Sequence, residues 1–135
     1  MPMEINKEKL KKIIQDGNAE ELNNYAEELG KRFKEPLVYR DERNQKRTEK
    51  ELSTSQIRNI LDEIQRISPK EDFKTKLHLL RPKLAYSAGR HRGRVKEFRE
   101  VVEEAIKYIE NQNHFKNFRN FIEAIVAYHR YYGGE

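Results

Sequence analysis

The sequence contains no cysteine and few of the features that place a protein outside the cytoplasm. A chain without thiols has no disulfide framework, no thiolate metal site and no thiol nucleophile. It also lacks an apolar run of about 18 residues, as a membrane helix needs, and a charged-then-apolar leader. We therefore expect a cytoplasmic protein that has no contact with a membrane.

Signals for β-structure are also few. Threonine occurs three times and valine five times, and no segment sustains an alternation of apolar and polar residues. Strands depend on both signals, so the one extended piece that we expect is short, from Leu37 to Tyr39. The chain of 135 residues is long enough for one domain. We predict an all-α fold, a compact bundle of five to six helices that spans residues 1–135.

Apolar residues recur every three or four positions in six segments, the spacing that places them on one face of a helix. Such faces pack together, so the six stripes are the candidate core. They comprise Leu10, Ile13 and Ile14; Leu22, Tyr25, Ala26, Leu29 and Phe33; Ile57, Ile60, Leu61, Ile64 and Ile67; Phe73, Leu77, Leu80 and Leu84; Val95, Phe98, Val102, Ala105, Ile106 and Ile109; and Phe115, Phe118, Phe121, Ile122, Ile125 and Val126.

Local signals mark where several of these helices begin or break. Asn18 and Asn113 are typical helix caps, and Ser53 with Gln56 has the spacing of a capping box. Pro82 lies inside the fourth stripe. A proline there removes a backbone donor and clashes one turn back, so we expect it to kink or split that helix.

Residues 40–51, RDERNQKRTEKE, contain no apolar side chain. A segment without an apolar anchor has little to gain from packing and stays in water. We predict a flexible charged linker between the second and third helices.

Motifs for catalysis and cofactor binding are missing. The sequence has no GxxxxGK[ST] or GxGxxG loop to hold phosphates, and neither HExxH nor GxSxG. Its four histidines lack the spacing of metal ligands. We expect no enzyme activity, no cofactor and no bound metal.

The net charge of +5 is concentrated in one block. Residues 74–99 hold nine lysines and arginines against the single Glu97. An ordinary solvated helix face mixes both signs, so this block indicates an anionic partner, although a charge run is often only a solvated face. Its run RHRGR (90–94) lies at a turn that we expect to be exposed between Gly89 and Gly93. Guanidinium groups and free backbone N–H groups can approach phosphates at such a turn.

Two residues of the candidate site can also be explained without any role in binding. Tyr86 lies one helical turn before Arg90 and offers a ring for base stacking beside the cations, yet a buried core role is the commoner use of such a ring. Arg58 lies on the face of the third helix opposite its isoleucines and is by default a surface residue.

Three segments, LSTSQIRNIL (52–61), LRPKLAYSAGR (80–90) and FRNFIEAIVAYHRYYGG (118–134), carry a family resemblance. In this order they resemble the small subunit of the Csm complex, the type III-A CRISPR effector, over about residues 33–134. The resemblance implies a small, all-helical, non-catalytic protein, present in several copies beside the duplex of guide and target RNA. It would contact the RNA backbone, neighbouring copies and other effector subunits.

The resemblance also implies which residues contact RNA. In the third motif it implies packing roles for Glu123, Ala127 and Tyr128. The RNA contacts, with Arg92 and Arg94 added from the basic turn, would be Lys46, Arg47, Gln56, Arg58, Arg81, Lys83, Tyr86, Arg90, Arg92 and Arg94.

Both lines of reasoning predict a scaffold that binds RNA independently of sequence, through phosphate contacts and stacking. The expected partners are the guide RNA, the single-stranded target RNA, further copies of the chain and other effector subunits. A homodimer of the isolated protein stays an open alternative. The second hypothesis is a helical adaptor whose basic face docks acidic protein partners.

Overall fold

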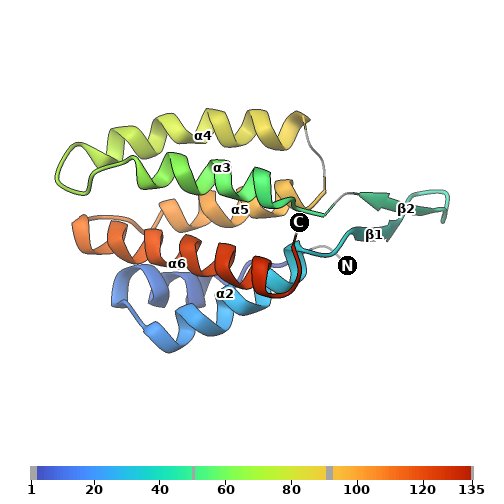
Figure 1. Ribbon diagram of the computed structural model, residues 1–135, viewed down its shortest axis with the longest axis horizontal. Coiled ribbons are helices and arrows are strands. Elements are labelled where there is room, and N and C mark those ends of the chain that lie inside the picture. The colour runs from blue at the N-terminus through green and yellow to red at the C-terminus, as the bar shows by residue number, and fades with distance from the viewer. Residues whose placement is uncertain (1–2, 50, 91–92, 135) are drawn as a thin grey trace.

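The computed structural model describes residues 3–49, 51–90 and 93–134, the side chains of residues 49 and 87–90 excepted. The helices form one bundle, and a two-stranded hairpin projects from one end of it (Figure 1). The predicted bundle of five to six helices is confirmed, with the hairpin as an addition. In chain order the elements are α1 (Lys7–Lys11), the π-helix η1 (Lys12–Asp16), α2 (Ala19–Phe33), β1 (Leu37–Arg40), β2 (Lys46–Glu49), α3 (Thr54–Gln65), α4 (Phe73–Arg90), α5 (Arg94–Ile106) and α6 (Gln112–Tyr131).

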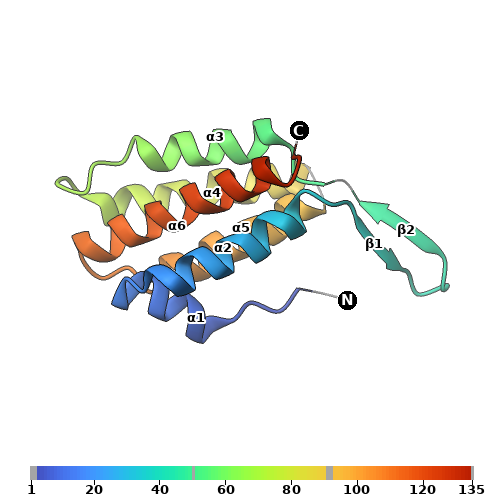
Figure 2. The ribbon, with the colours of Figure 1, turned by 60° about the horizontal axis from the view of Figure 1, so that its bottom comes forward.

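Helices α2 and α6 lie side by side and run in the same direction, although they are far apart in the sequence (Figures 1 and 2). Gly30 allows this approach. A Cβ atom at Gly30 would lie 2.7 Å from the backbone nitrogen of His129 and 2.8 Å from the Cβ atom of Tyr128. The two helices therefore touch along their backbones at this point.

The predicted apolar stripes form the core. All of their residues are buried except Leu22, Ile106 and Val126, which are half-buried. None of the described helices is long and apolar enough to cross a membrane.

Two of the three predicted helix caps are confirmed. Asn18 accepts a hydrogen bond of 3.0 Å from the backbone N–H of Glu21, and Ser53 and Gln56 form the reciprocal capping box. The prediction of Asn113 as the cap of the last helix is wrong, because Asn111 accepts the bond from the backbone N–H of His114.

The start of α6 is decided by a contact that the sequence pattern does not show. The backbone N–H of Glu110 donates a bond of 3.1 Å to Nδ1 of His114, which closes the first turn around Asn111. Asn111 and Asn113 have the same capping side chain, so this second bond favours the earlier position.

Helix α4 continues through Pro82, so of the two expected outcomes, a kink or a split, the split is excluded. Pro82 lies on the exposed side of α4, where water can satisfy the backbone carbonyl that loses its donor. Gly89, predicted to open the following turn, belongs to the last turn of α4, and Gly93, with φ of 90°, precedes α5 as its N-cap.

The hairpin replaces much of the predicted linker. Strands β1 and β2 pair antiparallel, with Tyr39 opposite Arg47 and Arg40 opposite Lys46. The short extended piece at Leu37 to Tyr39 is therefore confirmed, and β2 with the end of β1 occupies part of the predicted linker over 40–51. The flexibility of this segment stays a prediction.

A turn between the strands explains why so polar a segment is ordered. The carboxylate of Asp41 accepts bonds from the backbone N–H groups of Arg43 and Gln45, at 2.9 and 3.0 Å. Asn44 has φ of 60°, a left-handed conformation that asparagine tolerates better than most residues. Hydrogen bonds of the turn and the ladder thus take the place of apolar packing.

Candidate functional site

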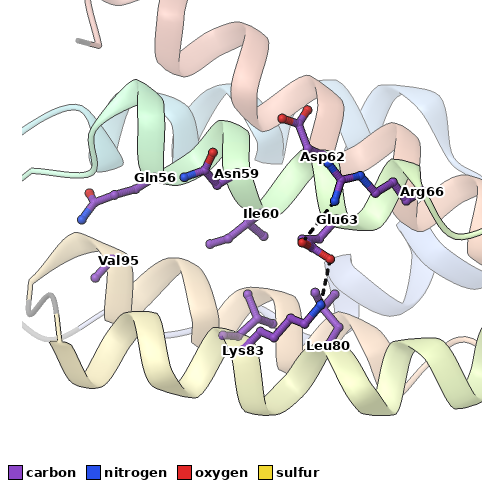
Figure 3. A pocket seen from close by; sticks show the side chains of 10 residues that line it. Gln56, Asn59, Ile60, Asp62, Glu63, Arg66, Leu80, Lys83 and Val95 are labelled. Carbon is purple, nitrogen blue, oxygen red and sulfur yellow. Dashed lines mark hydrogen bonds and ion pairs between the residues drawn. The ribbon is translucent and has the colours of Figure 1, made fainter.

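A cleft of about 380 Å³ runs along α3, from Gln56 to Arg66, and separates it from the middle of α4 (Figure 3). Its floor is apolar and its rim polar, which is the usual composition of a ligand-binding cleft. We call it the α3–α4 cleft. Its floor comprises Ile60, Leu80, Leu84 and Val95, and its rim Gln56, Asn59, Asp62, Glu63, Arg66 and Lys83.

Lys83 is the cation on the α4 side of this cleft. Its Nζ lies 3.1 Å from Oε2 of Glu63, whose other oxygen is 3.5 Å from Arg66 (Figure 3). An ion pair between exposed side chains contributes at most about 1 kcal/mol. Lys83 can therefore exchange this carboxylate for a phosphate at little expense in stability.

Tyr86 is 68% exposed, so its interpretation as a core residue is wrong. Leu79, which no motif had singled out, is 63% exposed on the same helix. Leu79, Lys83 and Tyr86 follow one another at intervals of four and three residues, which aligns them on one flank of α4. Arg90 follows Tyr86 by four more residues, in the last turn of the helix. We call these four positions the α4 stripe.

Gln56 lies on the opposite wall of the cleft, at the start of α3. Its Oε1 accepts the backbone N–H of Ser53 in the capping box, so this oxygen is committed to the helix end. Arg58 is exposed, but it lies on another side of α3. It precedes Gln65 by two helical turns, and Gln65 donates to Glu123 of α6, so Arg58 is directed toward α6 and away from the cleft.

Arg81 lies on the other flank of α4. Its Nε is 3.5 Å from Oε1 of Glu103 in α5. The second motif, LRPKLAYSAGR, thus places Arg81 and Lys83 on opposite sides of one helix. A surface that holds both would have to wrap around α4.

Lys46 and Arg47 lie on β2, away from the helical surface, and both are exposed. Nε of Arg47 lies 2.8 Å from the carboxylate of Asp41. The hairpin projects from the end of the bundle at which α4 ends (Figures 1 and 2). Lys46 and Arg47 therefore lie beyond the end of α4 and do not line the cleft.

The prediction of an exposed Arg94 is wrong. Its side chain is buried, with the residue only 7% exposed, and its guanidinium bonds to Glu97 at 2.6 Å and to the carbonyl oxygen of Glu35 at 3.0 Å. Arg94 is buried because it is the first residue of α5, whose first turn lies against the end of α2. Arg92, the neighbouring prediction, lies outside the described residues.

Besides the aliphatic floor and two carboxylates, Asp62 and Glu63, the described side chains of the cleft and the stripe include amide donors, the cations Arg66 and Lys83, and the ring of Tyr86. This set can neutralise phosphates and stack on a base. Among the residues that the structure describes, no three histidine, aspartate or glutamate side chains converge to hold a metal ion.

A family model described as Csm2 Type III-A matches residues 16–135. The chain belongs to the Csm2 family of type III-A. Csm2 is a subunit of the type III-A CRISPR complex, so the chain associates with other Csm subunits and with the guide RNA. The match includes α2, which the sequence resemblance had left out. No match was found among curated proteins or among solved structures.

The third Csm2-like motif lies in α6, where two of its three named residues make packing contacts. Glu123 accepts a bond of 3.1 Å from Gln65 of α3, and Tyr128 lies against Gly30. Ala127 is exposed, so it is not a packing residue within this chain.

Proposed function

We propose that this Csm2 protein is a non-catalytic, cytoplasmic scaffold subunit that holds guide and target RNA against the α4 stripe. The observation that carries the proposal is the exposed ring of Tyr86, one helical turn after Lys83 on the same flank of α4. A tyrosine that is 68% exposed does little for the core. Placed one turn from Lys83, the ring is suited to stack on a base while the lysine neutralises a neighbouring phosphate.

Such contacts are independent of sequence. Every base has a face on which a ring can stack, and every nucleotide has the same phosphate. A subunit that accepts any guide needs this tolerance. Gln56 supports the proposal from the other wall of the α3–α4 cleft, because the amide nitrogen of its side chain is a donor that the capping box does not use.

The hairpin extends the same surface. Tyr39 and Arg47 are directly opposite in the ladder and share one of its faces, and Arg40 and Lys46 share the other. Each pair places a cation where it can follow a phosphate chain beyond the end of α4. Arg58 and Arg81 point away from this surface, so we leave them out of the proposed RNA contact.

The first test is a double variant of the stripe. Lys83→Gln with Tyr86→Ala should weaken binding of unstructured single-stranded RNA more than tenfold, or about 1.4 kcal/mol, as measured by fluorescence anisotropy. The melting temperature should hardly change, because both side chains are exposed.

The matched control is Lys116→Gln, which removes the same charge from an exposed position on α6. It should leave RNA affinity within about twofold of the native value. An equal loss in the control would mean that net charge alone decides binding. A native affinity in the double variant would reject the α4 stripe as the RNA site.

Salt dependence tests the mechanism separately from the site. If each copy neutralises about four phosphates, log K should fall against log salt with a slope near −3, at about 0.7 per phosphate of a single strand. Titrations between about 50 and 300 mM salt with several unstructured RNA sequences measure this slope. A slope near zero would exclude the electrostatic mechanism, and strong differences among sequences would exclude the proposed tolerance.

A further inference from the structure

A second cleft, of about 270 Å³, lies on the other flank of α4, between this helix and α5. We call it the α4–α5 cleft. It shares no residue with the α3–α4 cleft or with the described part of the α4 stripe. The residues that line it are Lys74, Leu77, His78, Arg81, Glu103, Ile106, Lys107 and Ile109.

The floor of this cleft is aliphatic. Leu77, Ile106 and Ile109 form it, and the one ring among the described residues that line the cleft, His78, belongs to the rim. A base would therefore find no phenol, phenyl or indole ring in this cleft, in contrast to Tyr86 on the other flank. Aliphatic side chains of a partner would instead bury apolar surface here.

The rim of the cleft is mainly basic. Lys74, His78 and Arg81 follow one another along α4 at intervals of four and three residues, and Lys107 lies across from them at the end of α5. The one carboxylate on the rim, Glu103, is already engaged. Its Oε1 lies 3.5 Å from Arg81 and 3.5 Å from Arg99.

Because two arginines contact Glu103, one of them can turn to a carboxylate of a partner. If Arg81 turned to an incoming carboxylate, Glu103 would keep Arg99 as its partner. Lys107 is paired with the buried carboxylate of Glu104 at 2.9 Å, and if Lys107 turned away, Glu104 would keep Lys7 at 3.7 Å. The cleft can thus accept negative charge without leaving a buried carboxylate unpaired.

From this arrangement we infer that the α4–α5 cleft docks an acidic amphipathic helix of a partner protein. The three α4 positions of the rim span about 10 Å, or two helical turns. A helix laid along them would set aliphatic residues into the floor and carboxylates against Lys74 and Arg81, as in other helix-in-groove complexes. Helix α4 then has two faces, one for RNA and one for protein. This inference does not rest on the RNA proposal, because it uses other residues and other chemistry.

The test uses the full chain and a synthetic acidic helix as a probe. The probe is a peptide of about four turns made of leucine, glutamate and alanine, with the leucines three and four positions apart on one face. Binding is followed by anisotropy and by NMR of isoleucine methyl groups. The methyl signals of Ile106 and Ile109 should shift with the peptide and not with single-stranded RNA.

Two variants separate the faces of α4. Lys74→Gln with Arg81→Gln should weaken peptide binding at least fivefold and leave RNA affinity unchanged. Tyr86→Ala should weaken RNA binding and leave peptide binding unchanged. A control peptide with serine in place of leucine keeps its charge and should bind at least tenfold more weakly.

Three results would overturn the inference. One is equal binding of the leucine and serine peptides, because the floor would then contribute nothing. Another is peptide binding that does not shift the signals of Ile106 and Ile109. The third is a loss of RNA affinity in the Lys74 and Arg81 variant, which would assign this flank to RNA. Failure of the RNA proposal alone would appear as an unaffected Tyr86 variant and would leave the peptide result intact.

Discussion

Glu97→Ala is expected to lower the free energy of unfolding by about 3–5 kcal/mol, as is typical when one partner of a buried ion pair is removed. Glu97 is 8% exposed and accepts hydrogen bonds from two arginines, from Arg32 at 2.9 and 3.1 Å and from Arg94 at 2.6 Å. Without the carboxylate, the buried guanidinium of Arg94 keeps its bond to the carbonyl of Glu35 but has no counter-charge from Glu97. Denaturant unfolding measures the loss.

Glu100→Ala is the matched control, because Glu100 is exposed on the same helix. It should change the free energy of unfolding by no more than about 0.5 kcal/mol. A Glu97 variant as stable as this control would show that the two arginines find sufficient partners elsewhere, and the network would then have no role in holding α2 to α5.

The same network gives the protein a defined sensitivity to acid. Burial raises the pKa of the Glu97 carboxyl, but hydrogen bonds from Arg32 and Arg94 and their charges outweigh this effect and leave the pKa below its ordinary value. A carboxyl whose pKa is lower in the folded state stabilises it above the unfolded pKa, about 4.3, and loses this contribution as the pH falls through the folded pKa. The stability difference between the native chain and Glu97→Ala should therefore shrink below about pH 4.

Gly30→Leu should lower the free energy of unfolding by roughly 3 kcal/mol or more, at the upper end of overpacking effects. A side chain at this position meets the backbone of α6 at His129, which cannot move aside as the tip of a flexible side chain can. Gly30→Ala tests the sign of the change in the free energy of unfolding. Alanine usually stabilises a helix interior by 0.5–1 kcal/mol relative to glycine, yet here it should destabilise.

Asn24→Leu on the exposed face of α2 serves as the control for Gly30→Leu. Leucine there meets solvent and has a better helix propensity than asparagine, so stability should hold or rise by a few tenths of a kcal/mol. A Gly30→Ala variant more stable than the native protein would mean that α2 and α6 can move apart around the added methyl group with little loss of stability.

Local signals in the sequence predicted most of the helical architecture. The capping box of Ser53 and Gln56 and the cap at Asn18 depend on residues three positions apart, so the sequence alone displays them. The apolar stripes predicted the core for the same reason. Asn113 failed because Asn111 is an equally good cap, and the bond from Glu110 to His114 that favours it is not part of the usual capping pattern.

The hairpin and the burial of Arg94 depend on interactions that the hydrophobic pattern does not show, namely a polar turn and long-range contacts. Residues 40–51 have no apolar pattern, so their order comes from the turn at Asp41 and Asn44. The turn-forming side chains are present in the sequence, but a search for hydrophobic periodicity does not detect them. Arg94 looked exposed because it follows a glycine in a basic run. Its burial depends on Glu35 and Glu97, and the bond to Glu35 spans 59 positions of the chain.

The sequence predicted the residues of the candidate site, but it did not predict that those on α4 lie on two opposite flanks of this helix. Helical spacing alone separates Arg81 from Lys83, since two positions along a helix turn the side chain by about 200°. Which flank meets α5 and which meets α3 is decided by packing between helices, and that lies beyond a single-helix pattern. The exposure of Tyr86 follows from the same choice.

The packing of α6 against η1 and α2 also has a consequence for how the chain acquires its structure. Asn117 donates to the carbonyl of Ile14 and Tyr132 donates to Glu27, contacts that span 103 and 105 positions. Contacts of such long range close late and slow folding. During synthesis, α2 leaves the ribosome long before α6 exists, and its apolar stripe has no permanent cover in the meantime. A nascent chain of this protein is therefore expected to depend on protection from aggregation until its last helix emerges.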